Sequence, residues 1–407
     1  MSTRQRNGFK LAREPFTFDM VIGFLSKVPF SPPFLVILPA LTVLYHKQNH
    51  PNLVLPTTPV DALAFLTSLL ASEYKWVGYT WIFILLRSIN RGLNRYVRNH
   101  NEWRRDPIDY TNDLIVITGG SQGIGKQIVQ VLSHTKKAHI AVLDMSRPTY
   151  AAAPAGAPGI LYYKTDVSNA EQVAQAHTKM REATGGRKIG ALINCAGVAS
   201  GDTILDVDLD SAARVWRINT FANWLTAKQF LPDMIERNHG HVVTVSSAAA
   251  FAALPSMSEY ATSKAATLAF HECLAIELRT RYNAPRVRTT IVCPLKVRTA
   301  LAYGLQTRSV PFFNPVLEPV QVARKVVEAL DSGLSQHVVL PSIASSITSL
   351  RVAPDWLQRL VLALSNGDIA VTRQGVDDAI KHGYGKDWEG VDKQIWDRRA
   401  ASINKKA

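Results

Sequence analysis

The sequence predicts an α/β fold in which helices cover both faces of a doubly wound, mainly parallel sheet. Between residues 111 and 341, short runs rich in β-branched residues alternate with amphipathic helical segments. This alternation is typical of βαβ units. The run Leu-Ile-Val-Ile at 114–117 is apolar throughout, as expected of a parallel strand buried on both sides.

Seven segments carry the strand pattern, and they are Leu114–Thr118, Ala138–Leu143, Ile160–Lys164, Ala191–Asn194, His241–Val245, Val287–Val292 and Val338–Leu340. The chain has 407 residues, of which 47% are hydrophobic and 19% charged. It is therefore too apolar to be disordered and long enough for one large domain with additional segments. We expect three regions: 1–110, the α/β domain at 111–341, and a C-terminal helical extension at 342–407 with a short amphipathic helix over 356–362.

Residues 1–110 have the character of a membrane-anchoring, amphipathic region. Asp19 and Lys27 are the only charged residues between positions 16 and 45, and a second apolar stretch at 62–86 contains Glu73 and Lys75. Prolines at 29, 32, 33 and 39 argue against a straight spanning helix in the first stretch, and the two charges make spanning costly for the second. A hairpin, an interfacial insertion, a span and a globular helical cap all remain open.

The net charge of +14 favours an anionic partner, which could be nucleic acid, a membrane or a small ligand. Residues 1–110 hold 13 basic and 7 acidic side chains, a net of +6. Six arginines follow the second apolar stretch, at 87, 91, 95, 98, 104 and 105. This position favours anionic lipid headgroups and a catalytic domain facing the cytosol. No nucleic-acid-reading motif accompanies the charge, so we expect no nucleic-acid partner.

Other features of the chain limit the remaining classes. The first apolar run begins after four basic residues and lacks a small-residue cleavage site, so no cleaved signal peptide is expected. The three cysteines, Cys195, Cys273 and Cys293, have no metal-ligand spacing and are too few for a disulfide scaffold. We interpret them as small buried hydrophobic residues in a reducing compartment, and we expect no metal site.

A glycine-rich turn predicts a phosphate-binding loop. The sequence Thr118-Gly119-Gly120-Ser121-Gln122-Gly123-Ile124-Gly125 follows the first strand and opens a helix. Without Cβ atoms, the backbone can approach a pyrophosphate, and the helix N-terminus supplies free N–H groups. The next strand ends at Asp144, about 20 residues later, where a carboxylate accepts hydrogen bonds from ribose hydroxyls and repels a 2′-phosphate. The loop offers no basic residue, so we predict NAD over NADP, with Arg147 as the counter-argument.

A second constellation predicts proton transfer. Tyr260 and Lys264 are four residues apart, which places them on one face of a helix. An ammonium group beside a phenol lowers the phenol pKa and makes it a usable acid or base. Ser247 lies just after the strand 241–245 and can hydrogen-bond a reacting oxygen, and Asn219 lies in the preceding long helix.

Together these residues resemble the short-chain dehydrogenase/reductase family. The resemblance rests on Thr-Gly-x-x-x-Gly-x-Gly at 118–125, on Asn194-Cys195-Ala196-Gly197, and on the tetrad Asn219, Ser247, Tyr260 and Lys264. It covers about 111–341 and implies a Rossmann-type fold and a homodimer formed through the helices around Asn219 and Tyr260. It also implies a set of cofactor contacts: Gly119, Ser121, Gln122, Gly123, Ile124, Gly125, Asp144, Asp166, Val167, Asn194, Ala196, Gly197, Tyr260, Lys264, Pro294 and Thr299.

The chain departs from the family pattern at two positions. Cys195 replaces the second Asn of an Asn-Asn-Ala-Gly-like run, a change expected to alter strand packing more than chemistry. Leu295 replaces the Gly of the usual Pro-Gly pair before Thr299, which removes a flexible turn beside the expected nicotinamide contact. The tetrad itself is intact.

The family mechanism assigns a role to each tetrad residue. Tyr260, as the phenolate, would take the alcohol proton while hydride passes to the nicotinamide. Ser247 would hold the substrate oxygen, and Lys264 would lower the Tyr260 pKa and bind the nicotinamide ribose. Asn219 would hold a water that links Lys264 to solvent.

The substrate is expected to be a hydrophobic alcohol or its ketone or aldehyde. The expected lid, 296–319, and the segment after Ser247, 248–254, are both strongly apolar, although they could simply pack on the core. Together with the anchor, they are similar to the membrane- and lipid-droplet-associated subgroup of retinol and 17β-hydroxysteroid dehydrogenases. We therefore expect a retinoid, steroid or fatty alcohol, and location at the endoplasmic reticulum membrane or a lipid droplet. The alternatives are an NADPH-dependent 3-ketoacyl or 3-ketosphinganine reductase and a catalytically silent scaffold at a lipid surface.

Overall fold

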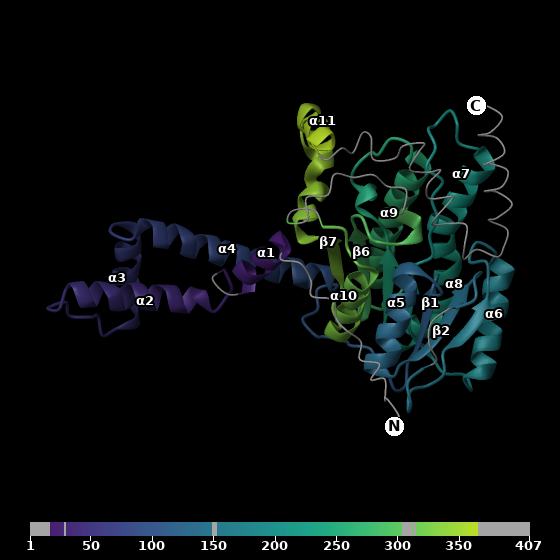
Figure 1. Ribbon diagram of the computed structural model, residues 1–407. Helices are drawn as coiled ribbons and strands as arrows, with labels where there is room; N and C mark the ends of the chain where they lie inside the picture. The colour runs from purple at the N-terminus through teal and green to yellow at the C-terminus, as the bar shows by residue number, and fades with distance from the viewer. Residues whose placement is uncertain (1–16, 28–29, 149–152, 303–311, 313–314, 365–407) are drawn as a thin grey trace, which may run out of the picture. The chain divides into compact units, whose positions relative to one another are not determined.

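The computed structural model describes residues 17–27, 30–148, 153–302, 312 and 315–364. The chain divides into two compact units (Figure 1). One comprises Met1–Ile84 with Ser309–Pro315, and the other comprises Leu85–Arg308 with Val316–Ala407. Each unit is described by itself below.

The second unit is built on a seven-stranded sheet in which every neighbouring pair is parallel. The strands are β1 (Leu114–Thr118), β2 (His139–Asp144), β3 (Leu161–Lys164), β4 (Ile189–Asn194), β5 (Gly240–Val245), β6 (Val287–Pro294) and β7 (Gln336–Leu340). Their order is β3-β2-β1-β4-β5-β6-β7. The α/β prediction with a doubly wound parallel sheet is confirmed. The observed limits differ from the predicted ones by at most two residues.

Helices cover both faces of this sheet (Figure 1). The helices of this unit are α5 (Gly123–Val131), α6 (Ala170–Ala183), α7 (Leu209–Trp216), α8 (Ala222–Arg237), α9 (Ser258–Thr280), α10 (Pro319–Ser332) and α11 (Asp355–Leu364). One core cluster joins the sheet to α5 and α10 through residues such as Ile128 and Val326. The other joins it to α6, α8 and α9 through residues such as Met180, Phe230 and Phe270. Apolar side chains therefore cover both faces of the sheet, which explains why a strand such as β1 is apolar throughout.

The predicted C-terminal helix over 356–362 falls within α11. A helical turn segment, Ser342–Val352, precedes it. The rest of the expected C-terminal extension, 365–407, lies outside the described residues.

The linker between α4 (Lys75–Arg98) and β1 is fastened to the amino ends of the strands by charged groups. Arg288 in β6 is completely buried and donates to the carbonyl oxygens of Asn99, at 3.0 Å, and Arg104, at 2.6 Å. His239 lies between Asp106 and Asp113, with 2.9 Å to each carboxylate. These bonds hold the chain where it enters the sheet.

The first unit is helical in its described part. It contains α1 (Phe18–Lys27), α2 (Phe34–Asn49) and α3 (Pro59–Ala71), and α4 begins in it. The second apolar stretch divides into two helices between Ala71 and Lys75, and Glu73 lies in the turn that joins them. In the first stretch, Pro32 and Pro33 precede α2, but Pro39 lies inside it. None of the described helices combines the length and apolarity that crossing a membrane requires.

Candidate active site

The glycine-rich loop folds as the motif predicts, because two of its glycines leave no room for a side chain. A Cβ on Gly119, whose φ is +66°, would lie 2.7 Å from Cα of Ala196, and a Cβ on Gly125 would overlap the carbonyl oxygen of Gly119. Helix α5 then begins at Gly123, and no side chain caps its first turn. The free N–H groups of this turn are suited to bind phosphate oxygens.

Asp144, at the carboxyl end of β2, joins the glycine loop to the next turn. Its carboxylate accepts 2.9 Å hydrogen bonds from the backbone N–H groups of Ser121 and Ser146. The Ser121 hydroxyl donates to the Ser146 carbonyl at 2.7 Å. Burial raises the pKa of Asp144, and the bonds from Ser146 and Ser121 oppose that effect. The carboxylate thus both shapes the loop and faces the adjoining cleft.

A cleft lies along the carboxyl ends of β1, β2 and β4, and most of the predicted cofactor contacts line it. These are Gly119, Gln122, Gly123, Ile124, Gly125, Asp144, Asp166, Val167, Ala196, Gly197 and Thr299. Thr299 lies beside the glycine loop, since a Cβ on Gly123 would be 3.3 Å from its methyl group. The structure therefore gathers residues from five separate sequence segments into one cavity, where a parallel sheet binds its ligands.

Five predicted contacts are not in the lining: Ser121, Asn194, Pro294, Tyr260 and Lys264. Ser121 is completely buried beneath the loop. Asn194 turns toward α8, where its Oδ1 accepts a 2.9 Å bond from Thr226, and among the described atoms its Nδ2 has no hydrogen-bond partner. The lining instead contains residues that the sequence reasoning did not select, including Met145, Ser146, Arg214, Ile218, Ala300 and Leu301.

Arg214 is the most informative of these, because it is a cation in the cleft. It comes from α7, and its charge interacts with Asp166 on the opposite wall. Burial lowers its pKa, and Asp166 opposes that effect. A single arginine in an amphipathic helix carries no sequence signal that separates it from the arginines of a solvated face. Arg147, the counter-argument to NAD, is exposed and does not line the cleft.

The tetrad residues lie together directly behind this cleft. A Cβ on the lining residue Gly197 would be 3.4 Å from both Nζ of Lys264 and Oδ1 of Asn219. Helix α9 carries Tyr260 and Lys264, as the four-residue spacing predicts, and Nζ lies 5.7 Å from the centre of the phenol ring. The predicted proton-transfer pair therefore adjoins the predicted dinucleotide cleft.

Burial dominates the protonation of this pair. It raises the pKa of Tyr260 to about 12, opposed by the hydrogen bond with Ser247. It lowers the pKa of Lys264 to about 8, while the neighbouring groups Cys195 and Cys293 oppose that shift. Nζ of Lys264 donates to the Val245 carbonyl at 3.0 Å, which holds the ammonium at the end of β5.

Asn219 lies in a wide helical turn, Arg217–Phe221, between α7 and α8 rather than in the middle of one regular helix. Both polar atoms of its side chain form hydrogen bonds. Oδ1 accepts from the Val198 N–H at 2.8 Å, and Nδ2 donates to the Val198 carbonyl at 2.9 Å and the Ser263 hydroxyl at 3.0 Å. Asn219 thus fastens the loop after β4 against α9. Its predicted role in holding a water stays a prediction.

Ser247 follows β5 and is buried beside the end of β6. Its hydroxyl accepts from the Ala249 N–H at 3.2 Å and reaches the Pro294 carbonyl at 3.5 Å. Leu295, at the family's usual glycine position, is not among the described residues with positive φ, and its N–H donates to Leu340 at 2.7 Å. The β6–β7 edge therefore accepts Leu here, because the backbone does not need the conformation that favours glycine.

Glu259, next to Tyr260 in α9, is a buried residue that the sequence reasoning did not select. Its Oε1 accepts bonds from the Ser200 hydroxyl at 2.5 Å and from the N–H groups of Ser200, at 3.1 Å, and Gly201, at 3.3 Å. It therefore ties the start of α9 to the loop after β4. No sequence motif marks it, because its partners are backbone groups about 60 positions away.

The apolar substrate wall is described in part. Ala248, Ala249 and Ala250 are buried, and Phe251 packs in a core cluster with Cys293. These residues therefore pack in the core, which was the alternative to a role in lining a substrate pocket. Of the expected lid, residues 303–311 and 313–314 lie outside the described residues.

The residues of the cleft fit a nicotinamide dinucleotide. The glycine loop leaves a cradle that a Cβ would fill, an uncapped helix start faces it, and a carboxylate stands at the ribose position. These are the groups that bind the pyrophosphate and adenosine ribose in dinucleotide-binding folds.

Comparison with known proteins agrees with this geometry. A family model described as short chain dehydrogenase matches residues 113–309. The chain is 35% identical to Dehydrogenase RED2 of Cochliobolus heterostrophus over 215 residues, which is 53% of this chain and 79% of that protein. It is 33% identical to human Short-chain dehydrogenase/reductase 3 over 236 residues, 57% of this chain and 76% of the relative. It is 31% identical to mouse Epidermal retinol dehydrogenase 2 over 224 residues, 54% and 71% of the two chains.

The family match thus extends over strands β1 to β6, the glycine loop and the tetrad, and these relatives are covered over more than two thirds of their length. The chain belongs to the short-chain dehydrogenase/reductase family and is an oxidoreductase that acts on CH–OH groups with NAD or NADP.

Proposed function

We propose that the protein is an NAD-dependent oxidoreductase that interconverts a hydrophobic alcohol and its ketone or aldehyde at a membrane or lipid-droplet surface. The alcohol class is retinoid, steroid or fatty alcohol. The observation that carries the cofactor choice is the Asp144 carboxylate, which lines the cleft at the end of β2.

The geometry of Asp144 supports NAD in two ways. Its two oxygens accept hydrogen bonds from the N–H groups of Ser121 and Ser146, and Asp144 lines the cleft. Acceptors in this position suit the two hydroxyls of a ribose and repel a 2′-phosphate. Arg147, the cation that could bind such a phosphate, is outside the lining.

The chain's own residues supply orientation and proton transfer. The bound nicotinamide supplies the acceptor or donor of hydride. The glycine loop and the start of α5 bind the pyrophosphate, and Thr299 lies beside the loop at the nicotinamide end of the cleft. Ser247 holds the substrate oxygen and stabilises the charge that develops there.

Tyr260 moves the proton of the substrate hydroxyl. Since burial raises its pKa to about 12, the free protein holds a neutral phenol, and cationic groups must lower that pKa for the oxidation step. Lys264, 5.7 Å from the ring centre, is the nearby cation of the tetrad. In the reductive direction the neutral phenol is the proton donor.

A lipid surface is supported by the two-sided pattern of α4. Apolar residues at 76, 79, 83, 86, 93 and 97 are exposed and recur every three, four or seven positions, so they share one face. Arginines at 87, 91, 95 and 98 follow a second stripe. A long helix with an exposed apolar face and a row of arginines is suited to lie at the boundary between acyl chains and anionic headgroups.

The relatives support the substrate class. Besides the mouse retinol dehydrogenase, the chain is 28% identical to Estradiol 17-beta-dehydrogenase 11 of Pongo abelii over 249 residues, 60% of this chain and 80% of that protein. An apolar substrate partitions into the bilayer, so a surface-bound enzyme would meet it there. We propose the endoplasmic reticulum or a lipid droplet as the location, with the catalytic domain on the cytosolic side.

A homodimer is also proposed. Trp216 in α7, Phe221 at the end of the wide turn and Trp224 in α8 are 43%, 53% and 42% exposed. Exposed aromatic side chains grouped on adjacent helix turns are typical of subunit interfaces. Light scattering on the purified chain should give twice the mass of 44.9 kDa, and Trp216→Lys should convert it to monomer.

The cofactor proposal is tested by turnover of retinol, steroid and long-chain alcohols with NAD and NADP, followed at the absorbance of the reduced nicotinamide. We expect a higher kcat/KM with NAD, and Asp144→Asn, which keeps one acceptor oxygen, should reduce that preference. Arg147→Ala is the matched control and should leave it unchanged. A preference for NADP that Arg147→Ala abolishes would overturn the proposal and favour the 3-ketoacyl or 3-ketosphinganine reductase alternative.

Surface attachment is tested separately by flotation of the full chain with vesicles that contain anionic phospholipid. Leu86→Glu with Leu93→Glu, on the apolar face of α4, should reduce flotation. Leu205→Glu alters a side chain that is 96% exposed outside this face and should not. Equal flotation of all three proteins, or none by the wild type, would contradict the proposal.

A further inference from the structure

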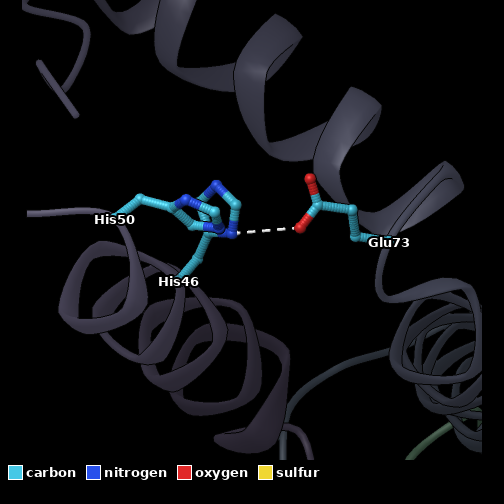
Figure 2. Close-up of side chains that lie close together, drawn as sticks. All are labelled: His46, His50 and Glu73. Atoms are coloured by element: carbon cyan, nitrogen blue, oxygen red, sulfur yellow. Dashed lines mark ion pairs between the residues drawn. The ribbon is translucent and has the colours of Figure 1, made fainter. Parts of the chain in front are cut away.

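Three potential metal ligands converge in the first unit, far along the sequence from the catalytic residues. His46 lies in the last turn of α2, His50 is the residue that ends this helix, and Glu73 lies in the turn between α3 and α4. One ligand atom from each of the three lies within 4.8 Å of the other two. Figure 2 shows the two imidazole rings side by side with the Glu73 carboxylate directed at them.

The helix geometry explains why the histidines meet. Residues four apart occupy one helix face, so their rings can share an ion. The ring centres of His46 and His50 are 4.4 Å apart, and the backbone N–H of His50 donates to the His46 carbonyl at 2.9 Å. The helix end therefore fixes the spacing of the two imidazoles before any ligand binds.

The third potential ligand, Glu73, comes from the turn between α3 and α4. Oε2 of Glu73 lies 3.2 Å from Nδ1 of His46. Zinc bonds of about 2.0–2.2 Å in a tetrahedral arrangement place neighbouring donor atoms roughly 3.3–3.5 Å apart. The His46–Glu73 separation is thus close to one edge of such a site. His50 and Glu73 are exposed, so their side chains can make the small rotations that the other edges need.

Aromatic packing holds the buried member in place. The side chain of His46 is 8% exposed. Its ring makes an edge contact with Tyr74, at 5.8 Å between centres, and a tilted contact with Phe65, at 6.3 Å. The Tyr74 hydroxyl lies 3.5 Å from the same Nδ1. A ligand whose orientation is set by its surroundings loses little freedom on binding a metal.

We propose that His46, His50 and Glu73 form a zinc site that clamps the end of α2 to the turn before α4. Two imidazoles and a carboxylate are ligands that zinc prefers, and a water completes the tetrahedron. The site stabilises the first unit and takes no part in hydride transfer, so its test is independent of the nicotinamide chemistry. The expectation of no metal site had rested on the cysteines, and the signal was the spacing His46-x-x-x-His50.

The competing explanation is a simple ion pair between His46 and Glu73. The two explanations differ in what they require of His50, because the ion pair does not involve it. Removal of His50 therefore separates them. His50→Ala removes the ring beside His46 but leaves the contacts of His46 with Tyr74 and Phe65 in place.

The experiment measures Zn²⁺ binding by the full-length chain after removal of metal with a chelator. Competition with a chromophoric chelator should give one equivalent of Zn²⁺ per wild-type chain. His50→Ala and Glu73→Gln should each weaken this binding at least tenfold. His134→Ala removes an exposed histidine of the wide helical turn Leu132–Lys136, which follows α5 in the second unit, and should bind like the wild type.

Two further readouts test the geometry and the clamp. Co²⁺ in place of Zn²⁺ should give the visible spectrum of a tetrahedral ion in the wild type and lose it in His50→Ala. Zn²⁺ should raise the melting temperature of the wild type and His134→Ala but of neither ligand variant. The proposal is overturned if the wild type binds no stoichiometric Zn²⁺, or if His50→Ala binds it as tightly as the wild type.

Discussion

The two ends of the parallel sheet use similar side chains for opposite purposes. At the amino ends of the strands, His239 bonds to Asp113 and Asp106, and Arg288 donates to the linker that leads into β1. At the carboxyl ends, Asp144, Asp166 and Arg214 line an open cleft. The charges at the amino ends are enclosed by the chain and hold the fold, whereas those at the carboxyl ends also line a cavity that a ligand can enter.

Two buried cations, Lys264 near the carboxyl ends of the strands and Arg288 at their amino ends, make the difference between the two ends measurable. Lys264 lies behind the cleft with a single carbonyl acceptor, Val245, and burial lowers its pKa to about 8. Arg288 donates to two carbonyls of the linker. Replacing each by methionine should separate activity from stability.

Lys264→Met should have the largest effect on activity. Loss of the ammonium removes the cation beside Tyr260, and we expect turnover to fall about 10²- to 10⁴-fold. Stability should change little, because the protein no longer buries a charge that its surroundings disfavour. Steady-state kinetics and thermal unfolding of the same preparation measure both. A variant that unfolds as readily as Arg288→Met would contradict the comparison.

Arg288→Met should show the opposite pattern. It leaves the carbonyls of Asn99 and Arg104 without their donor, which should cost about 2–5 kcal/mol of unfolding free energy. The kcat of the remaining folded protein should stay near the wild-type value, since the cleft is at the other end of the strands. Denaturant unfolding gives the first quantity and turnover the second. A large loss of kcat at unchanged stability would place Arg288 in the catalytic machinery.

The dependence of the unfolding free energy on pH should reflect the protonation of His239 at the amino ends of the strands. Hydrogen bonds with Asp106 and Asp113 raise the pKa of His239 to about 9, although burial opposes this. The folded protein therefore keeps a proton that the unfolded chain loses above pH 6.5. Stability is fully present below pH 6.5 and should fall by up to about 1.4 kcal/mol per pH unit as the pH rises to 9.

Asp113 contributes in a separate, acidic range. Burial raises its pKa, but the bonds from His239 and Arg237 outweigh this and hold the pKa below its ordinary value. Its stabilisation is present above the unfolded pKa of 3.8 and is lost as the pH falls below it.

The variant His239→Gln tests the effect expected above pH 6.5. It should flatten the dependence of the unfolding free energy on pH in that range, and an unchanged dependence would assign the effect to another group.

The sheet could be predicted well from the sequence, and the cleft could be predicted in part. The run Leu114–Thr118 is the observed β1, because a strand buried on both faces must be apolar throughout. The glycine loop and Asp144 reach one cleft, as their positions after β1 and β2 predict, and Thr299, which the family resemblance implied, lines the same cleft. Local patterns determine these features.

Features that depend on partners far away in the sequence could not be predicted. Arg214 reaches the cleft because of where α7 packs, and Asn194 turns away because Thr226 of α8 bonds it. The same holds for the wide turn at Asn219, which is held by Val198 and Ser263. A single sequence does not reveal such partners, since each contact joins segments 21 to 44 positions apart.

The central claim is that Tyr260, beside the dinucleotide cleft, transfers the substrate proton. The most direct test compares Tyr260→Phe with Tyr163→Phe, which alters a tyrosine of β3 outside the tetrad. Single-turnover hydride transfer is followed at saturating NAD after NAD binding by each variant has been measured. Tyr260→Phe should bind NAD and lose about 10²- to 10⁴-fold in rate, while Tyr163→Phe keeps the wild-type rate. A Tyr260→Phe protein that binds NAD and transfers hydride at the wild-type rate would contradict the account.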